Sequence, residues 1–407
     1  MIKCGLDLGG SKLRYGVSKN LIRVMDSKVL EIEPSAPVKE YASDDTLSDF
    51  VIVKHPMTSL CGRRFVRGDA LDNYRGDVLF CDNQDSKCNQ EITYINAAYG
   101  IAQDCVLNYY NAQEVQVTAC IPTAEYFSEE GLIEKFKNNL TGEYEIKFPR
   151  INQLVTFTVL PGNVTVTPEG VVAAYHYAYV DGFARGVTLI IDVGSRSTDI
   201  TVLRNFKPIG NSAVSRTKGG MNIISIVRSS LERDSILLNS DEIAYAFEHR
   251  YIIQDGKLVD VTDIVSNCIN VEDAKAALLD KFGIATSTDV DNALNKYYIR
   301  QGSGFLDITP YVTKAKKVFC SSVKNDILEV LSTDMSSLAS VNNILPMGRS
   351  FFGDVSSPDN MASILMQTLY PAQDGEDKHR AQLYADISWS LGNIQEIMNV
   401  VDGTSGN

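Results

Sequence analysis

Residues 187–203 read Val-Thr-Leu-Ile-Ile-Asp-Val-Gly-Ser-Arg-Ser-Thr-Asp-Ile-Thr-Val-Leu. The apolar run at 187–191 predicts a buried strand, and Asp192 follows it directly. Residues 194–197 have the composition of a tight turn, and 198–203 predict a strand that returns beside the first. We therefore expect a β-hairpin that carries a carboxylate close to its turn.

The beginning of the chain repeats this pattern. Ile2–Leu8 predicts a strand, Gly9-Gly10-Ser11 a turn and Lys12–Val17 the returning strand, with Asp7 near the end of the first strand. One glycine-rich turn alone indicates only an ordinary β-turn. Two matched copies, each with an aspartate at the strand end, favour two lobes of similar structure.

Both turns have the chemistry that a phosphate and its metal require. Glycine lets the backbone approach an anion without a Cβ clash, and successive turn amides can surround phosphate oxygens. Asp7 and Asp192 suit a hydrated Mg²⁺ that is held through water. The expected nucleotide-binding residues of the two turns are Gly9, Gly10, Ser11, Lys12, Gly194, Ser195, Arg196 and Ser197, and Arg196 can also point to solvent.

The rest of the chain alternates strands with helices, which predicts an α/β protein with mixed sheets. Further strands are expected at 28–32, 50–53, 114–120, 154–160 and 343–347. Helices are expected at 91–110, 131–140, 170–179, 220–231, 241–250, 271–282, 289–299, 313–332 and 385–400. Residues 34–60 are expected to form an insertion or a mobile loop around the strand at 50–53.

The composition indicates which kinds of binding partner and cellular location to expect. The 407 residues are 44% hydrophobic and carry a formal net charge of −13. That charge does not favour direct binding to nucleic acid or to anionic membranes. Eight dispersed cysteines without metal-site spacing fit reduced thiols, and no signal peptide or membrane span is recognisable. The expected location is the cytoplasm.

The paired turns resemble the two phosphate loops of the actin, heat-shock chaperone and sugar kinase superfamily. Within it, Leu189–Ile200 is most similar to the bacterial plasmid-segregation actins of the ParM type, as are the 95–110 helix and residues 115–126. The resemblance spans about residues 1–350. It implies an actin-like (ribonuclease H-like) fold of two lobes with mixed sheets and a nucleotide cleft between them. Domain I would comprise 1–180 plus 350–407, and domain II 181–349.

The resemblance also implies roles for residues outside the turns. Pro168–Tyr175 is similar to the superfamily's first interdomain connection, where a Glu or Gln orients the attacking water, and Glu169 matches it. The alternative for Glu169 is a glutamate that only complements a helix dipole. The implied catalytic residues are Glu169, Asp192 and Asp7.

Two more segments resemble the family's nucleotide-binding elements. Ser215–Asn222 is similar to the turn and helix that meet the ribose and phosphates, which implies Gly219, Gly220 and Asn222. Asn343–Ser350 occupies the place of the base-binding loop and implies Gly348 and Arg349. Met347 stands where the family has a glycine, so ATP and GTP both stay open, and Gly348 can instead be a helix cap.

The function implied by the resemblance is that of a filament-forming enzyme. It would hydrolyse ATP or GTP with Mg²⁺, associate with itself head to tail, and segregate plasmid DNA through a small DNA-binding adaptor on a centromere-like site. Two alternatives stay open. One is a sugar-type small-molecule kinase, whose catalytic Asp would have to be Asp69 or Asp77. The other is a nucleotide-switched scaffold that does not polymerise.

Overall fold

The computed structural model describes most of the chain, in two compact units. The described residues are 1–10, 12–18, 21–39, 46–81, 85–108, 114–128, 130–172, 174, 185–205, 207–266, 268, 271–283, 293–302, 304–333, 336–348, 351, 357–371 and 382–383. One unit lies within Met1–His176, and the other within Tyr177–Gly392. Ser11, Arg349, most of the expected 170–179 helix and the expected 385–400 helix lie outside the described residues.

The first unit is built on a ten-stranded mixed sheet with the order β3-β2-β1-β8-β10-β9-β5-β6-β4-β7. β1 pairs antiparallel with β2 and parallel with β8, which in turn pairs parallel with β10. The strands are β1 (Ile2–Leu8), β2 (Lys12–Gly16), β3 (Ile22–Asp26), β4 (Val29–Ile32), β5 (Asp49–Lys54), β6 (Arg63–Val66), β7 (Asp77–Leu79), β8 (Glu114–Ile121), β9 (Gly142–Phe148) and β10 (Gln153–Pro168).

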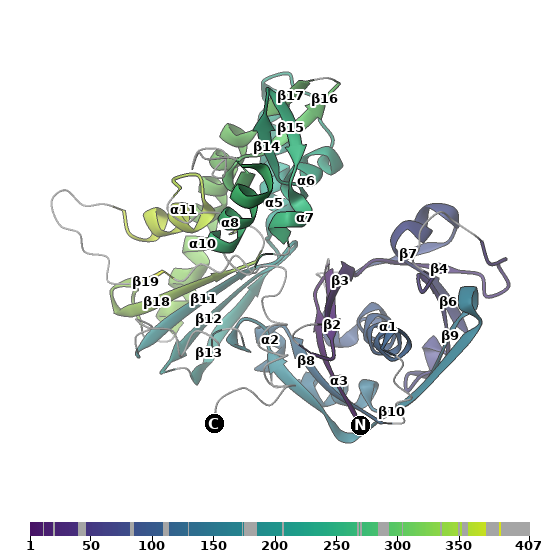
Figure 1. Cartoon of the computed structure of the whole chain (residues 1–407). Helices are drawn as coiled ribbons and strands as arrows, with labels where there is room; N and C mark the ends of the chain where they lie inside the picture. Colours follow the sequence, from purple (N-terminus) through teal and green to yellow (C-terminus); the bar gives the residue numbers. More distant parts are fainter. Residues whose placement is uncertain are drawn as a thin grey trace. The chain divides into compact units, whose positions relative to one another are not determined.

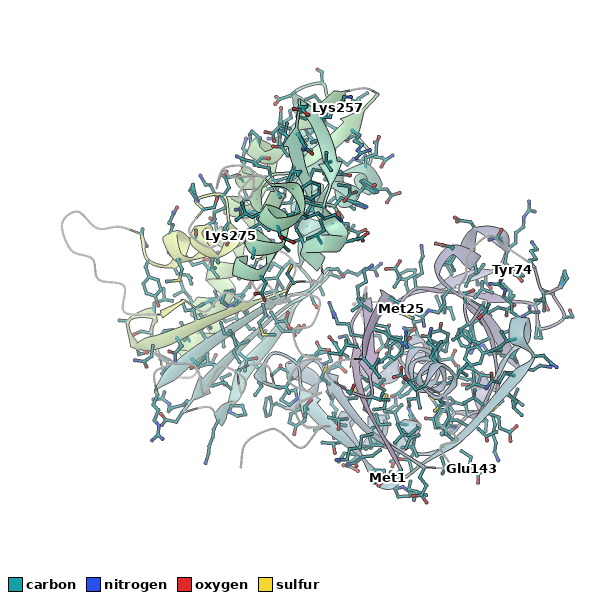
Figure 2. The ribbon with its side chains drawn as sticks, in the orientation of Figure 1. Met1, Met25, Tyr74, Glu143, Lys257 and Lys275 are labelled. Carbon is teal, nitrogen blue, oxygen red and sulfur yellow. The ribbon has the colours of Figure 1, made fainter. Side chains whose placement is uncertain are left out.

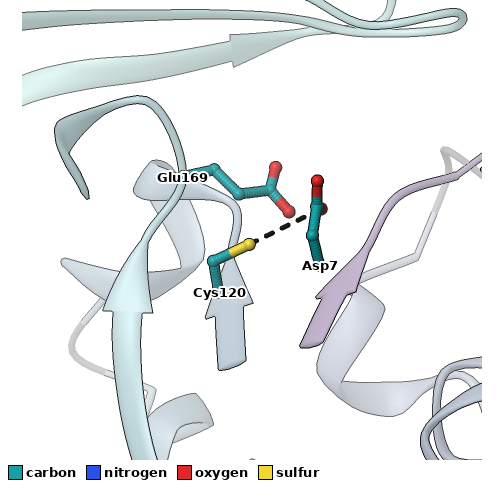
Figure 3. A group of neighbouring side chains, drawn as sticks. All are labelled: Asp7, Cys120 and Glu169. Atoms are coloured by element: carbon teal, nitrogen blue, oxygen red, sulfur yellow. Dashed lines mark hydrogen bonds between the residues drawn. The ribbon is translucent and has the colours of Figure 1, made fainter. Parts of the chain in front are cut away.

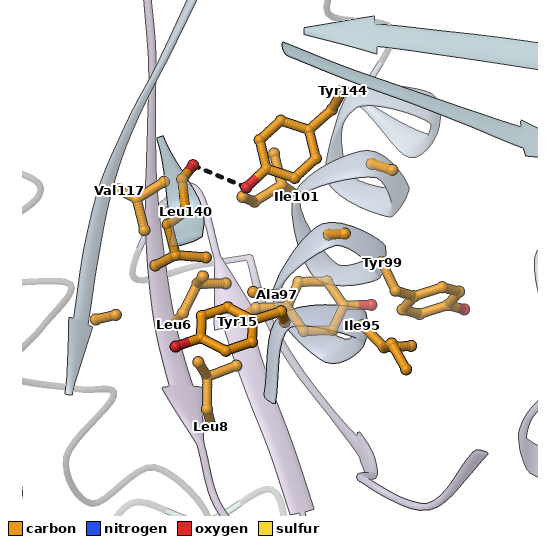
Figure 4. Close-up of a cluster of buried hydrophobic side chains, with 14 of the residues drawn as sticks. Leu6, Leu8, Tyr15, Ile95, Ala97, Tyr99, Ile101, Val117, Leu140 and Tyr144 are labelled. Atoms are coloured by element: carbon orange, nitrogen blue, oxygen red, sulfur yellow. Dashed lines mark hydrogen bonds between the residues drawn. The ribbon is translucent and has the colours of Figure 1, made fainter. Parts of the chain in front are cut away.

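Helix α1 (Glu91–Leu107) lies inside the curl of this sheet (Figure 1). Every residue from Ile92 to Cys105 is buried, so the helix is enclosed on all sides rather than along the single apolar face that its sequence predicts. Figure 4 shows Tyr15 and Leu8 of the first hairpin among the buried side chains of α1. A Cβ on Gly100 would lie 3.1 Å from the Tyr15 ring, so a glycine allows this close approach of helix and strand.

Short helices fill the remaining turns of the first unit. They are the helices α2 (Thr123–Tyr126) and α3 (Leu132–Leu140) and the 3-10 turns η1 (Thr58–Leu60), η2 (Gly68–Asn73), η3 (Lys87–Asn89) and η4 (Pro149–Ile151). The strand expected at 50–53, within the 34–60 insertion, is confirmed as β5 (Asp49–Lys54). Strand β5 lies within the sheet between β9 and β6, because its alternating Phe50 and Ile52 side chains are fully buried.

The second unit contains a five-stranded sheet in the order β13-β12-β11-β18-β19. Strands β11 (Val187–Val193) and β12 (Thr198–Arg204) form the expected hairpin, and β11 also pairs parallel with β18 (Val341–Met347). The edge strands are β13 (Lys207–Arg216) and β19 (Gln382–Leu383). Helices α5 (Gly220–Arg233), α10 (Thr309–Thr333) and α11 (Met361–Leu369) share one apolar core with this sheet.

A smaller part of the second unit carries two separate hairpins. They are β14–β15 (Tyr251–Gln254 with Lys257–Asp260) and β16–β17 (Tyr298–Gln301 with Gly304–Asp307), accompanied by α6 (Ser240–Glu248), α7 (Thr262–Ser266) and α8 (Val271–Phe282). The 3-10 turn η5 (Leu338–Ser340) directly precedes β18, and Leu338 packs against the main core of the unit. The prediction of a helix over 289–299 is wrong for its last two residues. Tyr298 and Ile299 begin β16, because aromatic and β-branched residues favour a paired strand.

The expected assignment of 350–407 to the first lobe is also wrong for part of that range. Met361, Leu365 and Leu369 of α11 are buried in the core of the second unit against α10. β19 pairs with β18 of the same unit. Helix α11 therefore belongs to the second unit, because its apolar face packs into the core of that unit.

Charged side chains such as Glu143 and Lys257 lie exposed on the surfaces of the two units (Figure 2). Among the residues that the structure describes, no helix combines the length and the apolar character that a membrane span needs.

Candidate functional site

The first hairpin presents Asp7 on the face of the sheet that points away from α1. Leu6 and Leu8 pack in the core, and side chains alternate along a strand, so Asp7 faces the other way. Arg14 is the cross-strand partner of Asp7 and donates to its Oδ2 from Nη1 at 2.9 Å. The Asp7 side chain is only 5% exposed, and Arg14 compensates its charge.

The turn of this hairpin is tight, as its glycines predict. A Cβ on Gly9 would lie 2.6 Å from the carbonyl oxygen of Lys12, so a glycine is required there. The carbonyl of Gly10 accepts a 2.7 Å hydrogen bond from Ser27 Oγ. Lys12, which we expected to contact phosphate, forms an ion pair with Asp26 on β3.

Three buried polar side chains meet where β1, β8 and β10 end. These strands are parallel neighbours, and Asp7 is in register with Cys120, so the ends that carry Asp7, Cys120 and Glu169 lie at one edge (Figure 3). One ligand atom of each of the three residues lies within 4.8 Å of the others. The Cys120 thiol donates to Asp7 Oδ1 at 3.6 Å.

Glu169 is held by its backbone as well as by its side chain. Its amide donates to the carbonyl of Ile121 at 2.8 Å, and its own carbonyl accepts from Thr123 Oγ1. Both partners belong to the end of β8 and the turn that follows it. This segment therefore fixes the point at which Glu169 leaves the sheet.

Lys87 completes the buried cluster. Its Nζ donates to Glu169 Oε1 at 2.7 Å. Burial acts to lower the pKa of Lys87, but the negative charge of Glu169 outweighs it, and the pKa is raised well above its usual value. Asp7 and Glu169 thus face two cations, Arg14 and Lys87.

Cys120 stays a neutral thiol in this setting. Burial raises its pKa well above the usual value, and the charges of Asp7 and Glu169 act in the same direction. It can donate a hydrogen bond to Asp7 but does not supply a thiolate.

The cluster fits Mg²⁺ better than a soft metal. Mg²⁺ prefers oxygen ligands and keeps several waters, and Asp7 and Glu169 supply carboxylate oxygens. Each carboxylate already accepts a hydrogen bond from Arg14 or Lys87, which suits contact with the ion through water rather than direct ligation.

The second hairpin lies against the beginning of α5. The amides of Gly220 and Met221 donate to the carbonyls of Gly194 and Ser195 at 2.9 and 2.8 Å. A Cβ on Gly219 would lie 2.6 Å from the Gly194 oxygen, so only a glycine allows this contact. Glycines 219 and 220 therefore position the turn, in addition to any contact with nucleotide.

Asn222 acts as a cap in this arrangement. Its Oδ1 accepts the amide hydrogen of Gly219 at 2.8 Å. The hydroxyl of Thr198 donates to the carbonyl of Lys218 at 2.6 Å, and Lys218 Nζ lies 2.6 Å from Asp326 Oδ2 on α10. These contacts connect the hairpin, α5 and α10.

Gly348 lies against the end of β11, close to the turn of the second hairpin. Its φ is +99°, and a Cβ there would lie 2.1 Å from the Val193 oxygen. Gly348 follows the strand β18, so it does not end a helix. Asp192 is half-buried at the end of β11, opposite Asp199.

No protein-family model matches the sequence, and no curated protein matches it. Solved structures do match. An archaeal actin homologue, Ta0583, is 12% identical with a TM-score of 0.63, over 99% of this chain and 100% of its own. The actin-like protein Alp7A is 14% identical with a TM-score of 0.65, over 99% and 96%. ParM of Bacillus thuringiensis, with ATP, is 12% identical with a TM-score of 0.58, over 98% and 97%.

The chain has an actin-like fold. This confirms the predicted fold class, and identities this low show the fold alone. Within this actin-like fold, Asp7 and Glu169 come together in the first unit. In the second unit, Gly219 lies against the backbone of Gly194, and Gly348 lies against the backbone of Val193 in β11. The functional roles of all these residues remain predictions.

Three residues of the first cluster were not predicted. Arg14 and Cys120 could have been found from register, because each pairs directly with Asp7 on a neighbouring strand. Lys87 lies in a 3-10 turn without a motif, and nothing in the sequence indicates that it reaches Glu169. Asp69 and Asp77, which a sugar kinase would need, are exposed and lie outside the cluster.

Proposed function

We propose that this actin-like protein binds ATP or GTP with Mg²⁺ between the turns of its two hairpins and hydrolyses it. The observation that supports this best is the buried cluster at the ends of three parallel strands. There the carboxylates of Asp7 and Glu169 lie beside the cationic side chains of Arg14 and Lys87. Buried charges of this kind are typical of active sites.

Residues of both hairpins, together with Glu169, have proposed roles in hydrolysis. Asp7 and Asp192 would hold the waters of a bound Mg²⁺, which would supply positive charge against the phosphates. The backbone amides at 9–12 and 194–197 bind the phosphate oxygens. Glu169 accepts a hydrogen bond from the attacking water and orients it toward the γ-phosphate.

Both units contribute residues in this proposal. The first unit supplies one phosphate turn and Glu169. The second supplies the other turn, the capped beginning of α5 and the Gly348 loop for the base. Structures with this fold include ParM with ATP and Ta0583 with ADP, which supports a nucleotide as the ligand.

We further propose that the protein forms filaments and segregates plasmid DNA in the bacterial cytoplasm. One ParM with the same fold is a non-polymerisable quadruple mutant, which supports polymerisation as a property to test. Head-to-tail contacts would give an open filament. Because the net charge is −13, DNA would be held through a basic adaptor rather than directly.

Pelleting with phosphate release tests this function. We expect the protein to sediment with ATP or GTP and Mg²⁺, to stay in the supernatant without nucleotide, and to release phosphate. Nucleotide binding without pelleting or phosphate release would favour the nucleotide-switched scaffold. Phosphate transfer to a sugar without pelleting would favour the kinase.

A further inference from the structure

The turn η3 that carries Lys87 is fixed by one carboxylate. Glu125 of α2 accepts hydrogen bonds from Ser86 Oγ at 2.6 Å, from the Lys87 amide at 2.8 Å and from the Cys88 amide at 3.2 Å. Such charge-assisted bonds to backbone amides are among the stronger ones in proteins. The backbone of Lys87 therefore has little freedom.

Helix α1 holds the same turn from the other side. Thr93 Oγ1 donates to the Lys87 carbonyl at 2.8 Å, and Tyr94 Oη donates to the Cys88 carbonyl at 2.6 Å. Both donors are buried on the most enclosed helix of the first unit. Two helices thus fix where the Lys87 side chain begins.

The side chain then reaches the carboxylate that we propose for catalysis. The Lys87 and Glu169 side chains are 16% and 9% exposed, and Nζ lies 2.7 Å from Oε1. A buried ion pair adds little net stability compared with apolar residues of similar volume. Stability is therefore a weak reason for this lysine, whereas holding a carboxylate in one orientation is a direct consequence of the contact.

We propose that Lys87 is a positioning residue for hydrolysis, which fixes the Glu169 carboxylate in the orientation that aligns the attacking water. This inference rests on the proposed function of Glu169. It assigns Lys87 no contact with the nucleotide. Misplacing a catalytic group by about 1 Å can cost about 10²-fold in rate, so the effect of a positioning residue can be large.

The test is a double-mutant cycle on phosphate release, with Lys87→Met, Glu169→Gln and the two combined. We expect Lys87→Met to lower kcat by about 10²-fold while the nucleotide Kd changes little, because Glu169 loses its orientation. In the Glu169→Gln background, Lys87→Met should change kcat by less than about 2-fold, since two residues that act as a unit are not additive. Lys87→Arg should restore part of the rate.

A matched control removes a lysine from the same neighbourhood. Lys135 of α3 donates to Asn89 of η3 but does not reach Glu169, and it is exposed. Lys135→Met should therefore leave kcat unchanged. Lys87→Met alone can fail to fold, because it leaves a buried carboxylate unpaired. In that case the kcat of the double variant is compared with that of Glu169→Gln, since the double variant has no unpaired charge. A lower kcat in the double variant would contradict the inference.

Two outcomes would overturn the inference, and they are distinct from a failure of the proposed function. A wild-type rate in Lys87→Met excludes a role for the lysine. An equal loss from Lys87→Met in both backgrounds shows that Lys87 acts independently of Glu169. If the wild type itself releases no phosphate, the proposed function is wrong, and the inference falls with it.

Discussion

At the scale of single residues, Glu169 and Asp192 carry the proposed chemistry. Glu169→Ala should slow phosphate release by about 10²-fold, because the attacking water loses its acceptor. Nucleotide-bound polymer should persist or last longer, since only hydrolysis is affected. Phosphate release and light scattering, followed together, check this, and faster turnover in the variant would contradict it.

The metal site gives a second prediction for single residues. Asp192→Ala should remove Mg²⁺-dependent phosphate release, because one of the two carboxylates that we propose hold the waters of the ion is lost. Exposed Asp241, also in the second unit, is a suitable control, and Asp241→Ala should keep the activity. Release that responds to Mg²⁺ equally in both variants would show that Asp192 has no part in the site.

A third prediction for single residues concerns Asp104, which is buried on α1. Burial raises its pKa to about 7, partly offset by Arg23, whose Nε lies 3.3 Å from Oδ1. Because the folded state binds this proton more tightly than the unfolded state, the free energy of unfolding should fall as pH rises from about 4 to about 7. Asp104→Asn should lose this slope and be more stable than the wild type at pH 8.

Chemical unfolding at a series of pH values measures that slope. His55 contributes to the free energy of unfolding with the opposite pH dependence, because burial lowers its pKa to about 4. Its stabilising contribution is lost as pH falls from about 6.5 to about 4. Asp104→Asn should therefore show a steeper loss in acid than the wild type. Identical pH profiles for the two proteins would exclude the assignment to Asp104.

At the scale of elements, the second hairpin depends on its contact with α5. Gly219→Ala would place a Cβ 2.6 Å from the Gly194 oxygen and push the turn away from the helix. We expect a loss of about 1–3 kcal/mol in stability, as for other overpacked sites, together with weaker nucleotide binding. Gly304→Ala is the control, because its Cβ would meet only an ordinary contact at 3.7 Å. Unchanged nucleotide binding in Gly219→Ala would contradict this account.

Elements also show what the sequence could and could not predict. The two hairpins were predictable, because short apolar strands on either side of a glycine-containing turn depend on local chemistry. The enclosure of α1 was not, because apolar spacing shows one face and cannot show a sheet that curls around it. The hairpins β14–β15 and β16–β17 were missed, because their strands are only four residues long.

The candidate site also contains residues that the sequence could predict and one that it could not. Asp7 could be predicted, since it lies near the end of a recognisable strand, and Glu169 was implied by the resemblance of Pro168–Tyr175 to the superfamily's first interdomain connection. Lys87 could not, because the contact that brings it to Glu169 depends on Glu125, whose place is decided by the packing of α2. Contacts between residues this far apart in the sequence can be located only once the fold is known.

At the scale of the whole molecule, the account depends on two turns, one from each unit, that bind a single triphosphate. A crystal structure with Mg²⁺ and a non-hydrolysable ATP or GTP analogue tests this most directly. We predict that the backbone amides of residues 9–12 and of residues 194–197 both lie within hydrogen-bond distance of the β- and γ-phosphates. A nucleotide bound to one turn alone, or away from both, would contradict the account.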